Sequence, residues 1–471
     1  MISELKPYSE YVDSGVHWLG KTPKHWSVLP NRALFDEVKD RNLPGEEMLS
    51  VTIKQGVIRQ KALLDGSSKK DSSNLDRSKY KLVRPGHIAY NKMRAWQGAI
   101  GVSDFKGIVS PAYVVVRSRD QSNLPRFFHH LFRTPQFAKE AERWSYGITS
   151  DMWSLRPEHF RLIFSPQPPP DEQAAIVKFL DWANGRIDRA IRAKRKVIAL
   201  LNEQKQVIIH RAVTRGIDPN VELKPSRLPW LGEIPRHWNI RKLGQLVHVF
   251  NGSTPSRTRL DYWTNGRHPW LSSSKVNDPL VSEPTEYISD AALAGTSLTL
   301  APKGSLIIGL VGQGKTRGTA TMLGIDAYIS QNIAALVKKE DISMEYLLFA
   351  LKGLYSNIRE LGRGGNQEAL NCEIVSSFRL PLPPKTEQET ILREVAESTK
   401  GIQILAEKAH REIQLLSEYR SRLVADVVTG KLDVTVAAKS LSAEIETAVA
   451  ETDVVADLDI EDETEIMEEQ A

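Results

Sequence analysis

Trp18-Leu19-Gly20-Lys21-Thr22-Pro23-Lys24-His25-Trp26 stands near the start of the chain and returns as Trp230-Leu231-Gly232-Glu233-Ile234-Pro235-Arg236-His237-Trp238. A second motif also repeats, because Pro168-Pro169-Pro170-Asp171-Glu172-Gln173 is matched by Pro383-Pro384-Lys385-Thr386-Glu387-Gln388. Single-residue matches extend the repeat: Leu155 with Leu370, Glu158 with Glu373, and Asp218 with Asp433. The sequences between these frames show little resemblance. The pattern indicates one architecture built twice, with different contents in each copy.

The bulk composition is that of a soluble globular protein, with 41% hydrophobic and 26% charged residues in 471. No apolar run reaches the ~20 residues of a membrane span, and the N-terminus lacks the apolar segment of a signal peptide. Cys372 is the only cysteine, which excludes an internal disulfide and a cysteine-based zinc cage. We therefore expect a cytoplasmic protein.

The charge distribution is uneven. The net charge is +5, but residues 437–471 contain twelve acidic residues and one basic residue, Lys439, and so carry −11, which leaves +16 on the rest. A strongly basic body favours a polyanionic partner. The acidic segment has no aromatic residues and is expected to be a disordered tail.

Each copy contains a mixed region of about 140 residues. Strand-like runs occur at 112–116 and 305–311, helical patterns occur at 125–137 and 344–361, and Gly and Asn separate them. This pattern predicts an α+β domain in each copy. We expect the repeated tryptophans and prolines of the frame to close a small core.

A long helix is predicted after each proline-rich stop. Asp171 and Thr386 are good N-caps, and no proline follows through Asp218 in the first copy or anywhere after Thr386 in the second. Apolar residues recur in a 4-3 pattern, which predicts a coiled-coil seam. Its positions are 176, 180, 183, 187, 190, 194, 197, 201, 204 and 208, and 391, 395, 398, 402, 405, 409, 412, 416, 419 and 423.

These features predict an α+β fold with a pseudo-two-fold internal repeat, in which two globular domains are joined by two long helices that form an antiparallel coiled coil. The expected segments are a first recognition domain (1–167), a first long helix (168–217), a second recognition domain (218–382), a second long helix (383–433) and an acidic, disordered tail (434–471). Two unlike domains at a fixed separation suit a split DNA sequence.

One motif suggests an enzyme instead. Gly309-Leu310-Val311-Gly312-Gln313-Gly314-Lys315-Thr316 matches G-x-x-x-x-G-K-[ST], the nucleotide-binding loop that lies between a strand and a helix. The residues that follow, Arg317-Gly318-Thr319-Ala320-Thr321, are typical of a strand or turn. We therefore prefer a loop that presents its polar side chains outward, and keep a P-loop NTPase with a coiled-coil arm as the alternative. We identify no catalytic, cofactor-binding or metal-ligating set.

The candidate DNA-binding residues lie in paired loops that carry side chains suited to phosphates and base edges. The first copy offers Lys92, Arg94, Trp96, Gln97, Thr149 and Ser150, and the second offers Lys275, Gln313, Lys315, Thr316, Arg317, Arg363, Asn366 and Gln367. Arg94 and Gln97 are suited to guanine and adenine edges, and Lys92 to phosphate.

The chain resembles the DNA-specificity subunits of bacterial type I restriction-modification systems. The resemblance is carried by Asp13-Ser14-Gly15-Val16-His17-Trp18-Leu19-Gly20, by its echo at 230–238, by the two Pro-Pro-x-x-Glu-Gln-x-x-Ile helix starts and by Ala212-Val213-Thr214-Arg215-Gly216-Ile217-Asp218. It covers the chain except the acidic tail.

The resemblance implies two target recognition domains that read the halves of a bipartite duplex site. It also implies helices that dock two methyltransferase subunits, and a motor-nuclease subunit that joins for cleavage. S-adenosylmethionine for adenine N6 methylation, and ATP and Mg, would lie on those partners, with no active site and no cofactor in this chain. A purely structural coiled-coil scaffold is the third possibility, which the size of the two loop-rich domains disfavours.

Overall fold

The computed structural model describes residues 5–41, 45–64, 77–147, 153–312, 314–362 and 368–441. The contacts divide the chain into two compact units. Unit 1 comprises Met1–Lys194 and Arg411–Ala471, and unit 2 comprises Arg195–His410. Each unit therefore contains one lobe and a part of each long helix.

Unit 1 combines short strands and short helices with a part of each long helix. Its strands are β1 (Tyr11–Asp13), β2 (Lys21–Pro23), β3 (Ser27–Pro30), β4 (Phe35–Glu37), β5 (Leu49–Thr52), β6 (Gly56–Arg59), β7 (Lys81–Val83), β8 (Ile88–Asn91), β9 (Ile100–Val102), β10 (Gly107–Val109), β11 (Tyr113–Ser118) and β12 (Phe164–Gln167). Its helices are α1 (Asn31–Leu34), α2 (Gln60–Leu64), the 3₁₀ helix η2 (Ala95–Gln97), α3 (Pro125–Phe132), α4 (Pro135–Arg143), α5 (Pro157–Phe160) and α13 (Thr435–Ser440).

Unit 2 repeats this order with an inserted three-stranded sheet. Its strands are β13 (Leu223–Pro225), β14 (Glu233–Pro235), β15 (Asn239–Lys242), β16 (Val247–Asn251), β17 (His268–Leu271), β18 (Glu286–Ile288), β19 (Leu306–Gly309), β20 (Ala320–Met322), β21 (Tyr328–Ile329), β22 (Ile333–Lys338) and β23 (Arg379–Leu382). Its helices are α7 (Leu243–Leu246), η4 (Leu260–Tyr262), η5 (Ser273–Asn277), α8 (Asp290–Ala294), α9 (Met344–Gly353), α10 (Tyr355–Arg359) and α11 (Cys372–Ser377).

The same sheet stands at the centre of both units. In unit 1 a four-stranded antiparallel sheet has the order β4-β11-β8-β9, and in unit 2 the order is β16-β22-β19-β20. The register also agrees, because Asn91 pairs with Tyr113 and Gly309 pairs with Ile333 at the same corner of the two sheets. The internal repeat therefore extends through the middles, where the sequences show little resemblance.

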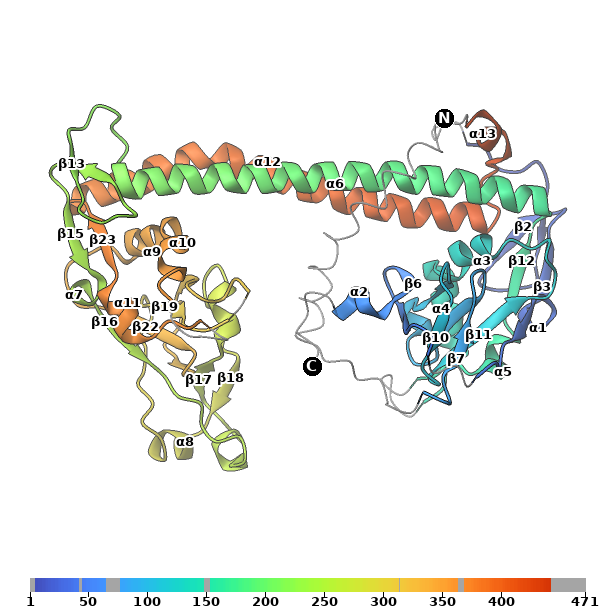
Figure 1. The fold of residues 1–471 in the computed structure, drawn as a ribbon, viewed down its shortest axis with the longest axis horizontal. Coiled ribbons are helices and arrows are strands. Elements are labelled where there is room, and N and C mark those ends of the chain that lie inside the picture. Colours follow the sequence, from blue (N-terminus) through green and yellow to red (C-terminus); the bar gives the residue numbers. More distant parts are fainter. Residues whose placement is uncertain are drawn as a thin grey trace. The chain divides into compact units, whose positions relative to one another are not determined.

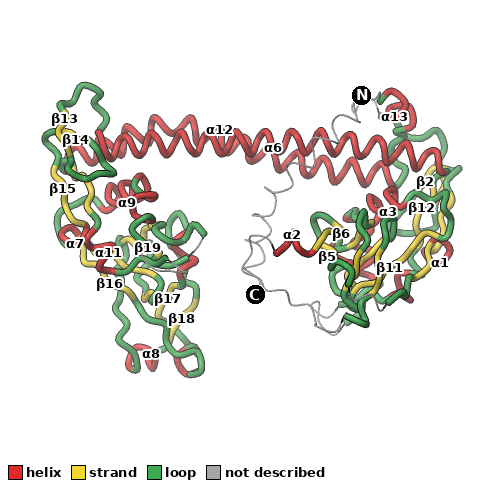
Figure 2. The backbone as a smooth tube through the Cα atoms, viewed as in Figure 1, coloured by secondary structure: helices red, strands yellow, loops and turns green. Residues whose placement is uncertain are grey.

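A helix covers each sheet and separates it from a long helix (Figure 2). In unit 1, α3 supplies Phe127, Phe128 and Phe132 to a core that also contains Ile176 and Leu180 of the long helix. In unit 2, α9 takes this place, since its residues pack in one core with Ile209 and Val213. Burial of these aromatic and aliphatic side chains, at ~25 cal/mol per Å² of apolar surface, fastens each lobe to its helix.

The repeated sequence frame is a latch between each lobe and the start of a long helix. In unit 1, Glu172 lies 2.8 Å from His25 Nε2 and accepts a hydrogen bond from the Tyr8 hydroxyl. In unit 2, Glu387 lies 2.7 Å from His237 Nε2 and accepts from Trp238 Nε1 at 3.0 and 3.1 Å. The expectation that the frame closes a core is confirmed, because the side chains of both frame tryptophans at the His-Trp step are buried.

The glutamine next to each glutamate has a second repeated task. Gln173 accepts from the N–H of Leu124 at 2.8 Å, just before α3. Gln388 accepts from the N–H of Ser343 at 3.2 Å, just before α9. Each Glu-Gln pair therefore holds the frame with one side chain and the beginning of the covering helix with the next, which explains why the two residues recur together.

The long helices are continuous, but each begins one residue before its predicted N-cap, so Asp171 and Thr386 lie in the first turns. Helix α6 (Pro170–Arg215) has 46 residues and α12 (Lys385–Val428) has 44. Their C-terminal glycines have left-handed backbones, with φ +73° at Gly216 and +77° at Gly430, which is the usual end of a helix. A Cβ on Gly430 would also lie 2.4 Å from a side-chain carbon of Pro23, so the β2 turn packs directly on the end of α12.

Ion pairs and one hydrogen bond join α6 to α12 inside the units. In unit 1, Asp188 accepts from Arg420 at 2.6 Å and Lys194 lies 2.6 Å from Glu412. In unit 2, Lys205 donates to Gln403 at 3.5 Å. In unit 1 the residue numbers rise on α6 as they fall on α12, so the two helices run antiparallel where they meet there, as Figure 1 shows.

Several of the predicted seam positions are displaced by one residue. Ile191 and Ile198 are buried, whereas Val197 is 46% exposed and Gln204 is exposed. On α12, Leu405 and Tyr419 are likewise exposed although we predicted them in the seam. A helix turns through 3.6 residues, so adjacent positions compete for every second seam place, and after Ile187 the buried residues Ile191 and Ile198 each lie one residue beyond a predicted position.

The end of the chain also differs from the expectation. Residues 434–441 are not a disordered tail, because α13 forms there and Val434, Ala438 and Leu441 are buried in the unit 1 core. The N–H of Asp433 donates to the carbonyl of Lys6 at 2.8 Å, which joins this segment to the start of the chain. Residues 442–471, which hold the acidic charge, lie outside the described residues.

Candidate nucleic-acid interface

The first candidate loop connects β8 to β9 in unit 1. It is folded tightly on its own backbone, since the N–H of Ala99 returns to the carbonyl of Arg94 at 3.1 Å and Trp96 Nε1 donates to the carbonyl of Met93 at 2.9 Å. The η2 turn packs against α4. With the backbone satisfied internally, the side chains of Arg94 and Gln97 are exposed.

The equivalent loop of unit 2 connects β19 to β20. The N–H of Gly318 donates to the carbonyl of Gly309 at 2.9 Å, and that of Gly309 donates to Thr319 at 3.0 Å, so the loop closes at its base. Lys315 is exposed at the turn, and its carbonyl accepts from the Tyr355 hydroxyl at 3.2 Å. A compact loop again leaves the sheet at its corner and presents a basic side chain.

Both loops are fixed at their first residue in the same way. In unit 1, the N–H of Lys92 donates to Ala112 at 3.3 Å and its carbonyl accepts from Leu155 at 2.9 Å. In unit 2, the N–H of Leu310 donates to Asn332 at 2.9 Å and its carbonyl accepts from Leu370 at 2.8 Å. These backbone bonds tie each loop to the strand beside it and to the segment that precedes α5 or α11.

The glycine-rich motif has a packing explanation. A Cβ on Gly309 would lie 2.2 Å from the carbonyl oxygen of Thr316, so only glycine permits this approach. The chain after Thr316 enters strand β20 rather than a helix. The loop therefore lacks the helix N-terminus that holds phosphate in a nucleotide-binding loop, as the sequence analysis predicted.

The structure gives the other predicted residues different surroundings. Lys92, Trp96 and Thr316 are half-buried, and Trp96 meets Trp153 edge to face at 5.5 Å. Lys275 is also half-buried and forms an ion pair with Asp278 at 3.0 Å, on the short helix η5. Contact of these residues with DNA stays a prediction.

Arg317 corrects one expectation. Its side chain is only 8% exposed, so it does not point outward from the loop as predicted. The guanidinium donates to the carbonyl of Glu368 at 2.6 Å and to its carboxylate at 2.7 Å. A buried charge needs such a partner, and this one lies 51 positions along the chain, where the sequence gives no signal of it.

Six predicted residues lie outside the described residues: Thr149, Ser150, Gln313, Arg363, Asn366 and Gln367. The ends of the first of these segments are nevertheless placed, because Tyr146 and Ser154 pair through backbone hydrogen bonds of 3.1 and 3.4 Å. In unit 2, the bond between Arg317 and Glu368 holds the end of the second segment beside the β19–β20 loop. Glu368, a described residue, thus lies beside the β19–β20 loop, and Trp153 lies beside Trp96 of the β8–β9 loop.

The structure also brings a turn to this region that the sequence analysis missed. The β5–β6 turn carries exposed Lys54 and Gln55. Arg133 donates both to the carbonyl of Ile53 at 2.8 Å and to that of Gly98 at 3.4 Å, so the turn lies beside the β8–β9 loop. Alternation of polar and apolar residues marks the strands, but nothing local indicates which loop the turn will meet.

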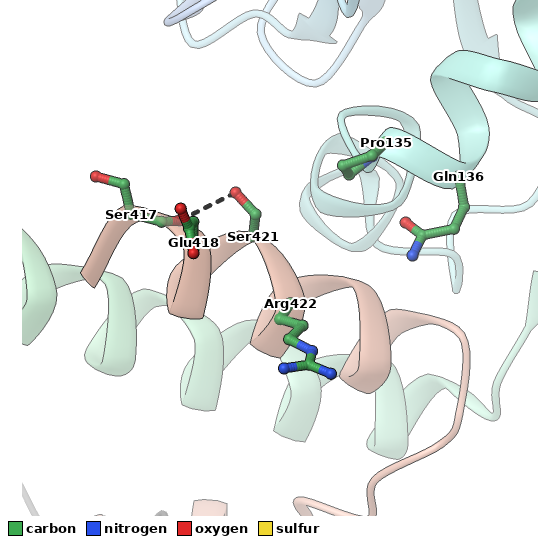
Figure 3. A pocket seen from close by; sticks show the side chains of 6 residues that line it. All are labelled: Pro135, Gln136, Ser417, Glu418, Ser421 and Arg422. Carbon is green, nitrogen blue, oxygen red and sulfur yellow. Dashed lines mark hydrogen bonds between the residues drawn. The ribbon is translucent and has the colours of Figure 1, made fainter. Parts of the chain in front are cut away.

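A hollow of about 400 Å³ in unit 1 lies between the start of α4 and α12 (Figure 3). Pro135 and Gln136 line one side, and Ser417, Glu418, Ser421 and Arg422 line the other.

In the described ranges no three His, Cys, Asp or Glu side chains gather as a metal site. Among those same residues, no helix has the length and apolar run that a bilayer crossing requires.

Comparison with known proteins shows what this chain is similar to. Residues 235–414 match the type I restriction modification DNA specificity domain. The specificity subunit of the Escherichia coli EcoR124I/EcoR124II type I restriction enzyme is 26% identical over 319 residues, 66% of this chain and 72% of that protein. The MjaVIII specificity subunit of Methanocaldococcus jannaschii is 23% identical over 349 residues, 72% and 78% of the two chains. Residues 235–414 therefore form a type I restriction-modification DNA specificity domain, and the chain is similar to specificity subunits over most of its length.

The fold agrees with this similarity to type I specificity subunits. A chain from a structure on the assembly and conformational transition of the type I R-M system matches with a TM-score of 0.59 and 16% identity, over 87% of this subunit and 99% of that chain. Specificity subunits are the non-catalytic components that recognise DNA in type I complexes, and this is the role of the present subunit.

Proposed function

We propose that this subunit reads a bipartite duplex target, with the unit 1 lobe on one half-site and the unit 2 lobe on the other. The equivalence of the two loops carries this assignment: the β8–β9 and β19–β20 loops leave the same corner of the same sheet but present different side chains. Duplication of the scaffold with divergence of the loops suits two unlike half-sites.

The exposed side chains favour readout in the major groove. In unit 1, Arg94 suits the O6 and N7 edge of guanine, and Gln97 suits the N6 and N7 edge of adenine. In unit 2, Lys315 is exposed and suits phosphate or guanine. The +16 charge of the chain without its acidic segment adds a sequence-independent attraction to phosphate.

We further propose that α6 and α12 form an antiparallel coiled coil that sets the distance between half-sites. The 46 residues of α6 correspond to about 69 Å at ~1.5 Å per residue. The antiparallel pairing in unit 1, through Asp188 with Arg420 and Lys194 with Glu412, and the contact of Lys205 with Gln403 in unit 2 support a stiff spacer. A coiled coil resists bending better than a single helix, because its seam buries apolar side chains along its length.

The helices also offer docking sites for partner subunits. Apolar side chains are exposed on them in unit 2 at Val197, Leu200, Val207, Ile404 and Leu405, and in unit 1 at Leu415. On α6 these positions follow helical spacing, so Val197, Leu200 and Val207 share one face. We propose that helices of two methyltransferase subunits cover such faces and that a restriction subunit joins the assembly.

The chemistry is then assigned to the partners. S-adenosylmethionine would bind the methyltransferase subunits, and ATP and Mg the restriction subunit. The specificity subunit would supply only the position on the duplex, which is consistent with loops that are built for exposure of side chains rather than for enclosure of a substrate.

Exchange of one lobe tests this function. Residues 26–165 are replaced with the corresponding region of a related specificity subunit, and the preferred duplex is determined by selection from a random library with the complex that the full chain forms. One half-site is expected to change while the other half and the gap stay the same. A change in both halves together would contradict one reader per unit.

A further inference from the structure

The β8–β9 and β19–β20 loops, here called the reading loops, each accept backbone hydrogen bonds from an arginine at the end of a helix. In unit 1, Arg133 stands at the end of α3 and donates to the carbonyls of Gly98 and Ile100 at 3.4 and 2.9 Å. In unit 2, Arg359 stands at the end of α10 and donates to the carbonyls of Gly314 and Arg317 at 2.5 and 3.3 Å. Each guanidinium therefore binds backbone oxygens of a loop that also carries exposed side chains, Arg94 and Gln97 in unit 1 and Lys315 in unit 2.

Arg133 also unites two segments. It donates to the carbonyls of Thr52 at 3.5 Å, Ile53 at 2.8 Å and Lys54, all in the β5–β6 turn. The planar fork of arginine presents five donors in a fixed geometry, which suits several carbonyls at once. All five of these acceptors are neutral, and burial lowers the pKa of Arg133 to about 10, so this arginine remains charged at neutral pH.

The two arginines do not occupy equivalent positions. The first follows α3, whereas the second ends α10, the counterpart of α4. The second is supported by Tyr355, whose hydroxyl accepts from Arg359 at 2.9 Å and donates to Lys315 at 3.2 Å. The two lobes have unlike loop sequences, yet in each an arginine binds the loop carbonyls, and it does so from a different helix. This argues that the contact serves function and was not simply retained from the duplicated scaffold.

We propose that Arg133 and Arg359 are positioning residues for base recognition, each of which fixes the reading loop of one lobe and thereby sets specificity at one half-site. Readout needs side chains within hydrogen-bond geometry of base edges, and small shifts in a loop remove that geometry. In unit 1 the same guanidinium adds the turn with Lys54 and Gln55 to the reading surface. This inference rests on the proposed function, because it presumes one reader per unit.

The experiment compares base preferences at both half-sites. Full chains that carry Arg133→Met, Arg133→Lys, Arg359→Met or Arg359→Lys are purified with the subunits that associate with them and used to select duplexes from a random library. Arg119→Met and Arg241→Met are the matched controls. Both are exposed or half-exposed arginines paired with a carboxylate, near the ends of β11 and β22 that lie away from the loops.

We expect Arg133→Met to lower the preference for the selected bases about tenfold at one half-site only, and Arg359→Met to do so at the other. The lysine variants should fall between, since one ammonium cannot reach all the carbonyls. The control variants should select the wild-type target. Thermal unfolding of each variant identifies a folding defect, and if Arg133→Met does not fold, Arg133→Lys and the Arg359 variants decide the outcome.

The results separate two failures. If the wild type selects no bipartite target, the proposed function is wrong. If it does, and the arginine variants keep wild-type preferences at both halves or lose affinity for all duplexes alike, the arginines are structural only and this inference is overturned.

Discussion

The N–H of Leu155 donates to the carbonyl of Lys92 at 2.9 Å, and this bond joins the start of the unit 1 reading loop to the segment that precedes α5. Leu370 makes the same bond to Leu310 at 2.8 Å in unit 2. The two leucines also correspond in the sequence repeat. The same leucine thus makes the same backbone bond in both units. The two scaffolds agree at the residue where the loops of unlike sequence begin.

Removal of the latch carboxylate should destabilise unit 2. Glu387→Ala leaves the buried Nε1 of Trp238 without its acceptor and breaks the contact with His237. The free energy of unfolding is expected to fall by about 1–3 kcal/mol, as measured by denaturant unfolding. The control is Glu389→Ala, which removes an exposed glutamate two residues further along α12. It should change the free energy of unfolding by less than about 0.5 kcal/mol. Equal effects of the two changes would show that the latch does not stabilise the fold.

His129 should make stability depend on pH. Burial lowers the pKa of His129 well below its usual value, and its Nδ1 accepts from the N–H of Val102 at 3.1 Å. Below pH ~6.5 the unfolded chain binds a proton that the folded chain does not, so this contribution is complete above that pH and is lost as the pH falls.

The replacement His129→Asn retains an acceptor but cannot be protonated. The loss of unfolding free energy between pH 7.5 and 5.0 is therefore expected to be about 1–2 kcal/mol smaller in this variant than in the wild type. His17→Asn, at an exposed histidine, should behave like the wild type. An unaltered pH dependence in His129→Asn would contradict a neutral, buried His129.

Lys315 distinguishes a DNA contact from a nucleotide site. Lys315→Ala should weaken duplex binding and reduce the slope of log K against log salt by about 0.9, because one phosphate contact is lost. Lys338→Ala, at the far end of β22, should leave the slope unchanged. ATP hydrolysis by the wild-type chain that disappears in Lys315→Ala would instead revive the nucleotide-binding alternative.

The sequence predicted what depends on local pattern. Proline stops and apolar periodicity identified both long helices, although each begins one residue before its predicted N-cap, and the motif around Thr316 was recognised as a loop because no helix pattern follows it. The repeat frame likewise revealed the duplication. Such features are encoded by neighbouring residues, so one sequence is sufficient to find them.

Features that depend on distant contacts were missed. The direction of Arg317 is set by Glu368, and the place of the β5–β6 turn is set by Arg133, in each case from far along the chain. The seam was displaced because both Ala190 and Ile191 fit an apolar stripe, and only packing decides between them. The common sheet of the two units is likewise invisible in sequence, since short strands tolerate many apolar residues.

The length of the helix pair tests the central claim most directly. Deletion of Ile187–Ala193 from α6 together with Gln414–Arg420 from α12 removes seven residues from each of two facing segments in unit 1, and keeps the seam in register. It should shorten the spacer by about 10 Å, which is about three base pairs. Deletion of residues 450–456, in the acidic segment, is the control. Selection of duplexes from a random library is expected to give the same two half-sites with a gap about three base pairs shorter, whereas an unchanged gap at undiminished affinity would contradict a helical spacer between two readers.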